Sequence, residues 1–208
     1  MSSMNRIIAD NMIVFISGVP GAGKTTISYT LLKNLEIFRI VQETDILREI
    51  LRGYNECLIK NTPIDKSELI NILPHTDLLS YSRAKEQCEA MKYSIEEIVK
   101  RQNRKSIPTI ICGVHIIPEI LYKTMSGSNI KYVNLYFDCE EDLYSHLKER
   151  DENKYGKKSV PFLFKMNSEL QDSILALQSE NPKCFTSVNV GKCSIEETAN
   201  IIINFLYQ

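Results

Sequence analysis

Residues 12–25 read MIVFISGVPGAGKT, and this stretch decides the class of fold. Residues 12–17 are an apolar run of β-branched and aromatic side chains that stops at a glycine, a pattern typical of a strand buried on both faces of a parallel sheet. Residues 18–25 then fill the spacing G-x-x-x-x-G-K-[ST]. Residues 25–35 follow with an apolar stripe at helical spacing. The stretch therefore predicts a strand, a glycine-rich loop and a helix in succession.

A loop of this spacing between a strand and a helix binds the phosphates of a nucleotide. Its glycines let successive backbone N–H groups approach a β-phosphate at the helix N-terminus. Lys24 is expected to reach the β- and γ-oxygens and the Thr25 hydroxyl to ligate Mg²⁺, so the predicted cofactors are ATP and Mg²⁺. The residues expected to contact the nucleotide are Gly18, Pro20, Gly21, Ala22, Gly23, Lys24, Thr25 and Thr26.

Strand and helix patterns alternate along the rest of the chain, which predicts an α/β fold: a three-layer sandwich around a five-stranded parallel sheet with right-handed crossovers. The expected strands are residues 12–17, 38–42, 108–112, 131–137 and 185–190. The expected helices include residues 25–35, 45–52 and 75–104. In the second of these, Ile46, Ile50 and Leu51 are expected to face inward, with both arginines elsewhere. The third has an expected inward stripe of Ala84, Cys88, Met91 and Ile95. Asp138 with Glu141, and Ser194 with Glu197, predict capping boxes.

Composition sets the broad class of protein. The 208 residues predict one domain, residues 1–208. The 25 basic and 26 acidic residues nearly cancel, which gives no reason to expect nucleic acid or a membrane surface as partner and makes any anion site local. Six scattered cysteines without a Cys-x-x-Cys pair indicate reduced thiols, and no leader or long apolar span is visible, so a cytoplasmic protein is expected. Whether the chain forms a homodimer stays open.

Three further segments carry a resemblance to a known family. Residues 43–52 (ETDILREILR) resemble the S-T-D-x-[IL]-R-E-x-[LM]-R segment of the 2-phosphoglycerate kinase family. Residues 113–118 (GVHIIP) resemble the end of its E-G-V-H-[LI]-V-P segment, and residues 170–175 its [IL]-Q-x-x-L helix. The resemblance implies a P-loop kinase core of the nucleoside and shikimate kinase type, which transfers the γ-phosphoryl of ATP to a small anionic metabolite.

The first segment supplies candidate site residues. Asp45 follows the second strand at its carboxyl end, where ligands bind in open α/β sheets. There it can hold Mg²⁺ through water or accept the proton of an attacking hydroxyl, or it can cap the helix that follows. Arg48 and Arg52, one turn apart, can clamp an anionic substrate, or belong to a solvated helix face.

Two other regions complete the expected site. Gly113 and His115 follow the third strand, so the histidine is expected over the acceptor pocket as a hydrogen-bond donor, or else as a buried structural residue. Residues 149–160 are expected to close over ATP as a lid, with Arg150 bringing a cation to the transferring phosphoryl. Residues 53–104 are expected to be a helical insertion on the substrate side.

One departure from the family stands at Cys112, where the family has an acidic residue before the glycine. Such a carboxylate would hold the water shell of Mg²⁺ or act as base. The acidic role then passes to Asp45, with Asp138 and Glu119 as weaker candidates. Two other functions stay open: a nucleoside, nucleotide or sugar-nucleotide kinase, with Tyr54 or Tyr81 stacking on a base, and an ATP-binding regulatory protein without transfer activity.

Overall fold

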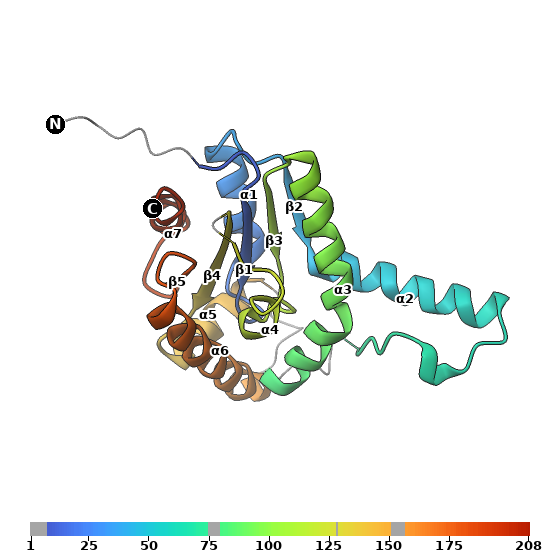
Figure 1. Cartoon of the computed structure of the whole chain (residues 1–208). Helices are drawn as coiled ribbons and strands as arrows, with labels where there is room; N and C mark the ends of the chain where they lie inside the picture. Colours follow the sequence, from blue (N-terminus) through green and yellow to red (C-terminus); the bar gives the residue numbers. More distant parts are fainter. Residues whose placement is uncertain (1–7, 75–79, 128, 151–156) are drawn as a thin grey trace.

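The fold is built on a five-stranded sheet whose strands are all parallel, in the order β2-β3-β1-β4-β5 (Figure 1). The computed structural model describes residues 8–74, 80–127, 129–150 and 157–208. The strands are β1 (Ile13–Ser17), β2 (Ile40–Glu43), β3 (Thr109–Cys112), β4 (Ile130–Tyr136) and β5 (Phe185–Asn189). All five expected strands are present, and the predicted α/β sandwich with a parallel sheet is confirmed.

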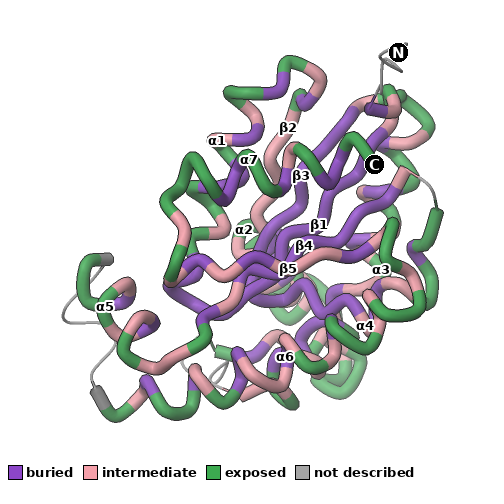
Figure 2. Tube along the Cα trace, turned by 90° about the vertical axis from the view of Figure 1, so that its left-hand side faces the viewer, coloured by how far each residue is buried: buried purple, intermediate pink, exposed green. Residues whose placement is uncertain are grey.

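Helices cover both faces of the sheet, so the strands form the buried middle layer (Figure 2). One group consists of α1 (Lys24–Asn34) and α7 (Ile195–Leu206), which contact each other. The other group consists of α3 (Tyr81–Lys105), α4 (Pro118–Leu121) and α6 (Val160–Glu180), with α5 (Glu140–Arg150) packed against α6. Among the helices in the described ranges, none combines the length and the apolar character needed to cross a membrane.

Aromatic rings on three neighbouring strands form the centre of the core. Tyr132 on β4 stacks between Phe15 on β1, at 4.9 Å between ring centroids, and Phe185 on β5, at 5.0 Å. All three rings are fully buried, and the Tyr132 hydroxyl donates a hydrogen bond to the Met125 carbonyl at 2.6 Å. The polar end of this tyrosine is therefore satisfied although it lies in the core.

The long helix α3 carries the predicted buried stripe, and Ala84, Cys88, Met91 and Ile95 are all inaccessible to solvent. The helix begins at Tyr81 rather than at the expected residue 75. The first five residues of the predicted helix, 75–79, lie outside the described part of the chain.

The two predicted capping boxes have different outcomes. Ser194 and Glu197 form the expected reciprocal pair at the start of α7. The box at Asp138 is wrong: α5 begins two residues later, at Glu140, and the Asp138 carboxylate accepts a hydrogen bond from the Lys192 amine. A partner from a distant segment therefore replaces the local cap.

Amide side chains fasten α6 to the sheet. Asn167 accepts from the Phe137 N–H at 3.0 Å and donates to the Phe137 carbonyl at 2.9 Å. One turn further on, Gln171, the glutamine of the family-like helix segment, accepts from Asn134 on β4 at 2.8 Å and donates to Ser187 on β5 at 3.2 Å. These bonds fix α6 against β4, β5 and the residue that follows β4.

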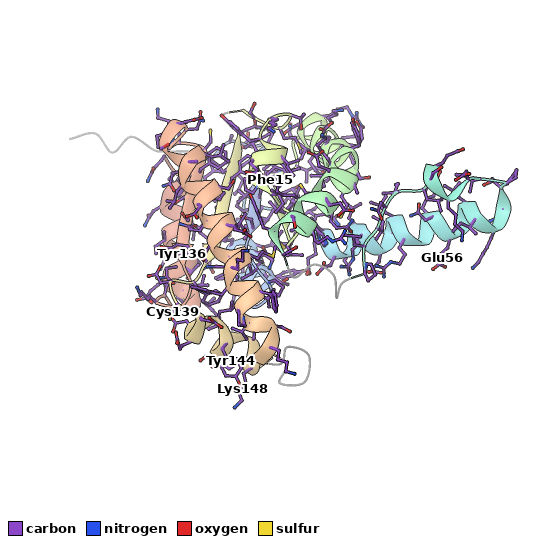
Figure 3. All side chains as sticks on the ribbon, turned by 90° about the horizontal axis from the view of Figure 1, so that it is seen from below. Phe15, Glu56, Tyr136, Cys139, Tyr144 and Lys148 are labelled. Carbon is purple, nitrogen blue, oxygen red and sulfur yellow. The ribbon has the colours of Figure 1, made fainter. Side chains whose placement is uncertain are left out.

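Helix α2 (Thr44–Asn61) starts at the sheet and projects away from it as an arm (Figure 1). A short 3₁₀ turn, η1 (Lys66–Glu68), lies on the returning segment. Asn55 joins the two sides of the arm, because its amide bonds both backbone groups of Ile70, at 2.7 and 3.3 Å. Figure 3 shows Glu56 on this arm, far from Phe15 in the body of the molecule.

The predicted inward face of α2 is wrong for two of its three residues. Ile46 and Ile50 are 57% and 60% exposed, whereas Leu47 and Leu51 are buried. Arg48 is also buried, although the arginines were expected elsewhere. Apolar spacing indicated one face, but only the first turns of α2 lie against the body, and they do so along the 47–51 edge.

Candidate active site

The glycine-rich loop connects β1 to α1 at the carboxyl edge of the sheet. Gly18 has φ 143°, and a Cβ added there would lie 2.6 Å from the Leu135 carbonyl oxygen, so only glycine fits. Gly23 precedes α1 without a side-chain cap. Because glycine has no side chain, nothing at this position caps the first N–H groups of α1, as is required where the start of a helix binds an anion.

A cavity of about 500 Å³ opens above this loop. It brings together the loop, the ends of β2 and β3, and α5. Of the expected nucleotide contacts, Gly18 and Ala22 are buried and do not line the cavity. The lining residues are Pro20, Gly21, Gly23, Lys24, Thr25, Thr26, Glu43, Asp45, Cys112, Gly113, Val114, His146 and Glu149.

Three polar residues of α1, Lys24, Thr25 and Thr26, line the cavity, and the side chains of the first two have defined partners. The Lys24 amine donates to the Val19 carbonyl at 2.9 Å, which holds it over its own loop. The Thr25 hydroxyl donates to Oε2 of Glu43 at 3.0 Å. Lysine and threonine thus stand at the positions from which they could contact nucleotide phosphates and a cation.

Glu43 is a site residue that sequence reasoning missed. It ends β2 and is paired in register with Cys112, the last residue of β3. The expected strand stopped at residue 42, and Glu43 was not among the expected site residues. The available signal was an acidic residue at the carboxyl end of a parallel strand, where ligands of open α/β sheets bind.

Cys112 brings no charge to the cavity. Burial raises the pKa of its thiol, and although the nearby Lys24 ammonium lowers that pKa, the net shift is upward. The thiol is therefore neutral near pH 7. This agrees with the expectation that cysteine does not replace a carboxylate at this position.

His115 lies beneath the site rather than over an acceptor pocket, because its side chain is fully buried. Its Nδ1 lies 3.0 Å from the Thr44 hydroxyl and 3.7 Å from Oδ1 of Asp45. Thr44 in turn packs on Gly113 so closely that a Cβ there would lie 1.8 Å from the hydroxyl oxygen. The burial fits the second alternative, a buried structural residue, and the contacts suit a residue that positions the start of α2. The role of His115 as donor to an acceptor stays a prediction.

The two arginines of α2 are both held by Glu49. Nε and Nη2 of Arg48 lie 3.2 and 3.0 Å from Oε1, and its Nη1 lies 3.9 Å from Oδ1 of Asp45. Arg52 bonds Oε2 of Glu49 at 3.3 Å and the Leu73 carbonyl at 3.2 Å. Neither arginine lines the cavity above the phosphate loop, so their expected contact with an anionic substrate stays a prediction.

Helix α5 contributes two lining residues, His146 and Glu149, that sequence analysis did not single out. The His146 ring packs edge-on against Phe137 at 5.0 Å between centroids. Helix α5 can be found in Figure 3 by the labels on two of its other residues, Tyr144 and Lys148. Arg150 is the last residue of α5, but its side chain and residues 151–156 lie outside the described part of the chain. The lid and the role of Arg150 therefore stay predictions.

A second cavity of about 410 Å³ lies between the starts of α3 and α6. Of the two aromatic residues expected to stack on a base, Tyr81 lines it, whereas Tyr54 is exposed on the arm. The cavity is lined by Ser80, Tyr81, Ser82, Lys85, Phe162, Lys165 and Glu169.

The two weaker candidates for the acidic role lie elsewhere. Glu119 on α4 pairs with Lys85 at 2.5 Å and accepts from Ser173 at 2.8 Å. Burial raises the pKa of this carboxyl, but the bonds from Lys85 and Ser173 outweigh burial and lower it. Asp138 pairs with Lys192. Within the described ranges, no three His, Cys, Asp or Glu side chains gather as a metal-binding group.

Comparison with known proteins returns kinases, although no family model matches the chain. It is 28% identical over 215 residues to a protein named "Probable thymidylate kinase" from Methanocaldococcus jannaschii, covering 96% of this chain and 97% of that protein. It is 26% identical over 140 residues to a 2-phosphoglycerate kinase from Methanococcus vannielii, covering 63% of this chain and 44% of that protein. The chain thus spans less than half of the latter relative.

The fold is also found in a solved kinase structure. A gluconokinase from Sinorhizobium meliloti superposes with a TM-score of 0.56 at 13% identity, over 95% of this chain and 93% of that one. At this identity the match shows the fold alone. The sequence relatives, both named kinases, support the predicted resemblance to P-loop kinases and the enzyme class of phosphotransferase.

Proposed function

We propose that this chain, similar over nearly its whole length to a P-loop kinase, transfers the γ-phosphoryl of ATP to a small anionic metabolite. The observation that carries the proposal is the cavity at the carboxyl edge of the sheet. Lys24 and Thr25 of the phosphate loop line it together with the Asp45 carboxylate. Phosphoryl transfer needs positioning and charge neutralisation more than covalent chemistry, and these groups can supply both.

The residues at the cavity fit a Mg²⁺ ion bound with the nucleotide. The Thr25 hydroxyl and the carboxylates of Asp45 and Glu43 are oxygen ligands of the kind that Mg²⁺ prefers, directly or through water. When bound, the ion would neutralise charge on the β- and γ-phosphates. In this proposal Lys24 exchanges its bond to the Val19 carbonyl for the phosphates, and Asp45 orients the attacking hydroxyl or accepts its proton.

Two classes of acceptor follow from separate observations. The resemblance to 2-phosphoglycerate kinases favours a small phosphorylated acid, with Arg48 and Arg52 moving from Glu49 to the acceptor. A nucleotide is the second candidate, because the relative matched over 97% of its length is named "Probable thymidylate kinase" and because Tyr81 and Phe162 line the second cavity. In both cases we propose residues 149–160 as the lid and residues 53–104 as the insertion on the acceptor side.

The test is ATP-dependent product formation by the purified chain with Mg²⁺, with 2-phosphoglycerate and thymidine monophosphate offered separately and products identified by mass. Lys24→Ala is expected to lower the transfer rate on the order of 10² to 10³-fold, because it removes a contact to the developing charge. Lys33→Ala, in the last turn of the same helix, is the matched control and should keep the wild-type rate. Wild-type turnover by Lys24→Ala contradicts the proposal.

Asp45→Asn separates catalysis from helix formation at the start of α2. The proposal expects turnover to fall on the order of 10²-fold while the affinity for ATP changes less than about twofold, since the carboxylate acts in the transfer step. Turnover and binding are measured on the same preparation. Asp45 lies in the first turn of α2, after the N-cap residue Glu43, so an unchanged rate would limit its role to stabilising that turn.

A further inference from the structure

We propose that Glu49 is an internal ligand of an anion site formed by Arg48 and Arg52, and that it leaves this site when an acceptor bearing a phosphate binds. Glu49 thereby sets the affinity for the acceptor and favours anionic over neutral acceptors. The inference rests on the proposed function, because it concerns how the same site selects its substrate. No role was expected for Glu49 from the sequence.

One carboxylate bridges both guanidinium groups. Oε1 of Glu49 accepts from Nε and Nη2 of Arg48 at 3.2 and 3.0 Å, and Oε2 accepts from Nη1 of Arg52 at 3.3 Å. Arginine side chains bind external carboxylates and phosphates through the same paired N–H groups. Glu49 therefore occupies the position in which the two arginines would hold an anionic group of a substrate.

The three side chains differ in how far they can move. The side chain of Arg48 is 8% exposed and that of Arg52 is 39% exposed, whereas that of Glu49 is 51% exposed. Arg52 is also held by the Leu73 carbonyl, to which its Nη2 donates at 3.2 Å. Ion pairs with a solvent-exposed partner contribute little to stability, so Glu49 can turn toward the solvent at low cost. A second anion that takes its place then offsets the loss of the carboxylate from the buried arginine.

Helix geometry does not by itself favour the bond between Glu49 and Arg48. Residues three or four positions apart on a helix face each other, whereas adjacent residues do not. Arg52 has the favourable spacing from Glu49, but Arg48 does not. Charge attraction by the arginines therefore holds the carboxylate in this position, and a more highly charged anion can compete for the same N–H groups.

The anion site adjoins the cavity above the phosphate loop. Nη1 of Arg48 lies 3.9 Å from Oδ1 of Asp45, and Asp45 lines that cavity. An anionic group bound at Arg48 would thus lie next to the carboxylate that we propose to act on the attacking hydroxyl. This position suits the acceptor rather than the nucleotide, whose phosphates are expected at Lys24.

The chemistry of the site indicates the class of ligand. A phosphate monoester carries about 1.5 to 2 negative charges near pH 7 and three terminal oxygens, whereas the carboxylate of Glu49 carries one charge and two oxygens. A phosphate can therefore displace Glu49 from both arginines, and a neutral hydroxyl or amide group cannot. Both acceptor candidates, 2-phosphoglycerate and thymidine monophosphate, carry such a phosphate.

The experiment measures anion binding without turnover. The full chain is saturated with Mg²⁺ and AMP-PNP, an ATP analogue that does not transfer its γ-phosphoryl, and is titrated by calorimetry with 2-phosphoglycerate or with thymidine monophosphate. The variants are Glu49→Ala and Glu49→Gln. Glu56→Ala is the matched control, because Glu56 lies on the same helix, is 64% exposed and pairs at 3.9 Å with Lys60.

We expect Glu49→Ala to bind at least one of the two ligands about 3 to 10-fold more tightly than wild type, because an exposed carboxylate no longer competes. Glu49→Gln should have intermediate affinity, since its amide oxygen accepts hydrogen bonds without a charge, and Glu56→Ala should match wild type. The affinity for AMP-PNP should stay within about twofold in all variants. In turnover, KM for the acceptor should fall while kcat stays within about twofold.

Unchanged or weaker binding by folded Glu49→Ala overturns the inference, because Glu49 then orients the arginines instead of competing for them. If Glu49→Ala does not fold, Glu49→Gln decides in the same way. If wild type binds neither ligand measurably, binding by Glu49→Ala supports the inference, and no binding by either protein overturns it.

Failure of the inference differs from failure of the proposed function. Tighter binding by Glu49→Ala without phosphorylation of either ligand supports the anion site and rejects transfer to these acceptors. Phosphorylation by wild type with unchanged binding in Glu49→Ala supports the kinase proposal and rejects only the internal ligand.

Discussion

At the end of β3, Gly113 leaves the space that the Thr44 hydroxyl occupies. A Cβ at Gly113 would lie 1.8 Å from that oxygen, so Gly113→Ala forces the first turn of α2 to shift. We expect a loss of about 2 to 4 kcal/mol in the free energy of unfolding, as for overpacked or strained positions. Turnover should fall as well, because Thr44 and Asp45 move together. Urea unfolding and kinase assays measure the two effects.

Gly53 is the matched control for this substitution. It lies within α2, and a Cβ added there meets nothing within 4 Å. Gly53→Ala should therefore stabilise the chain by about 0.5 to 1 kcal/mol, since alanine is the better helix former. Equal stability losses for the two glycines would show that close packing against Thr44 does not matter.

Single residues mark the limit of what the sequence could predict at the site. The phosphate loop was identifiable because its spacing is local. Glu43 was not, because its importance depends on the register between β2 and β3 and on the contact with Thr25, both between distant segments. The burial of His115 has the same origin: its partner Thr44 lies 71 positions away in the chain.

At the scale of elements, α2 offers a direct test of which face packs. Leu51→Ala removes a side chain that is 8% exposed and should cost about 2 to 3 kcal/mol of stability. Ile50→Ala removes one that is 60% exposed and should change stability by less than about 0.5 kcal/mol. Urea unfolding of both variants gives the comparison. A loss of about 2 kcal/mol or more in Ile50→Ala would restore the inward position that the sequence predicted for this residue.

Most strands and helices could be predicted from the sequence, and the physical reason differs between strands and helices. Strands of a parallel sheet are buried on both faces and stand out as apolar runs. The stripe of α3 was read correctly because that helix packs on the body along much of its length, as its buried residues show. The face of α2 was read incorrectly because most of that helix projects from the body, where apolar spacing does not report burial.

The reactivity of the cysteine thiols tests how they are buried in the molecule as a whole. Cys57 is exposed on the arm, whereas Cys88 is buried in α3 and burial raises the pKa of its thiol to about 12. Because the thiolate is the reactive form, alkylation of Cys88 at mildly alkaline pH should be slower than that of Cys57 by at least about 10³-fold. Mass spectrometry of peptides from the labelled native protein measures both rates.

Two controls accompany the labelling. In concentrated urea the two thiols should react at similar rates, because burial is then absent. In Cys57→Ser the slow reaction of Cys88 should persist unchanged. Rapid alkylation of Cys88 in the native protein would mean that the α3 face opens without global unfolding.

The position of β2 has a consequence for how activity responds to mild perturbation. This strand has four residues, stands at the margin of the sheet and pairs with β3 alone. Its last residue is the one that holds the Thr25 hydroxyl. Fraying of a single short ladder would thus separate that carboxylate from the phosphate loop while the other four strands stay paired. Gentle warming or dilute denaturant should therefore inactivate the protein before its bulk structure melts.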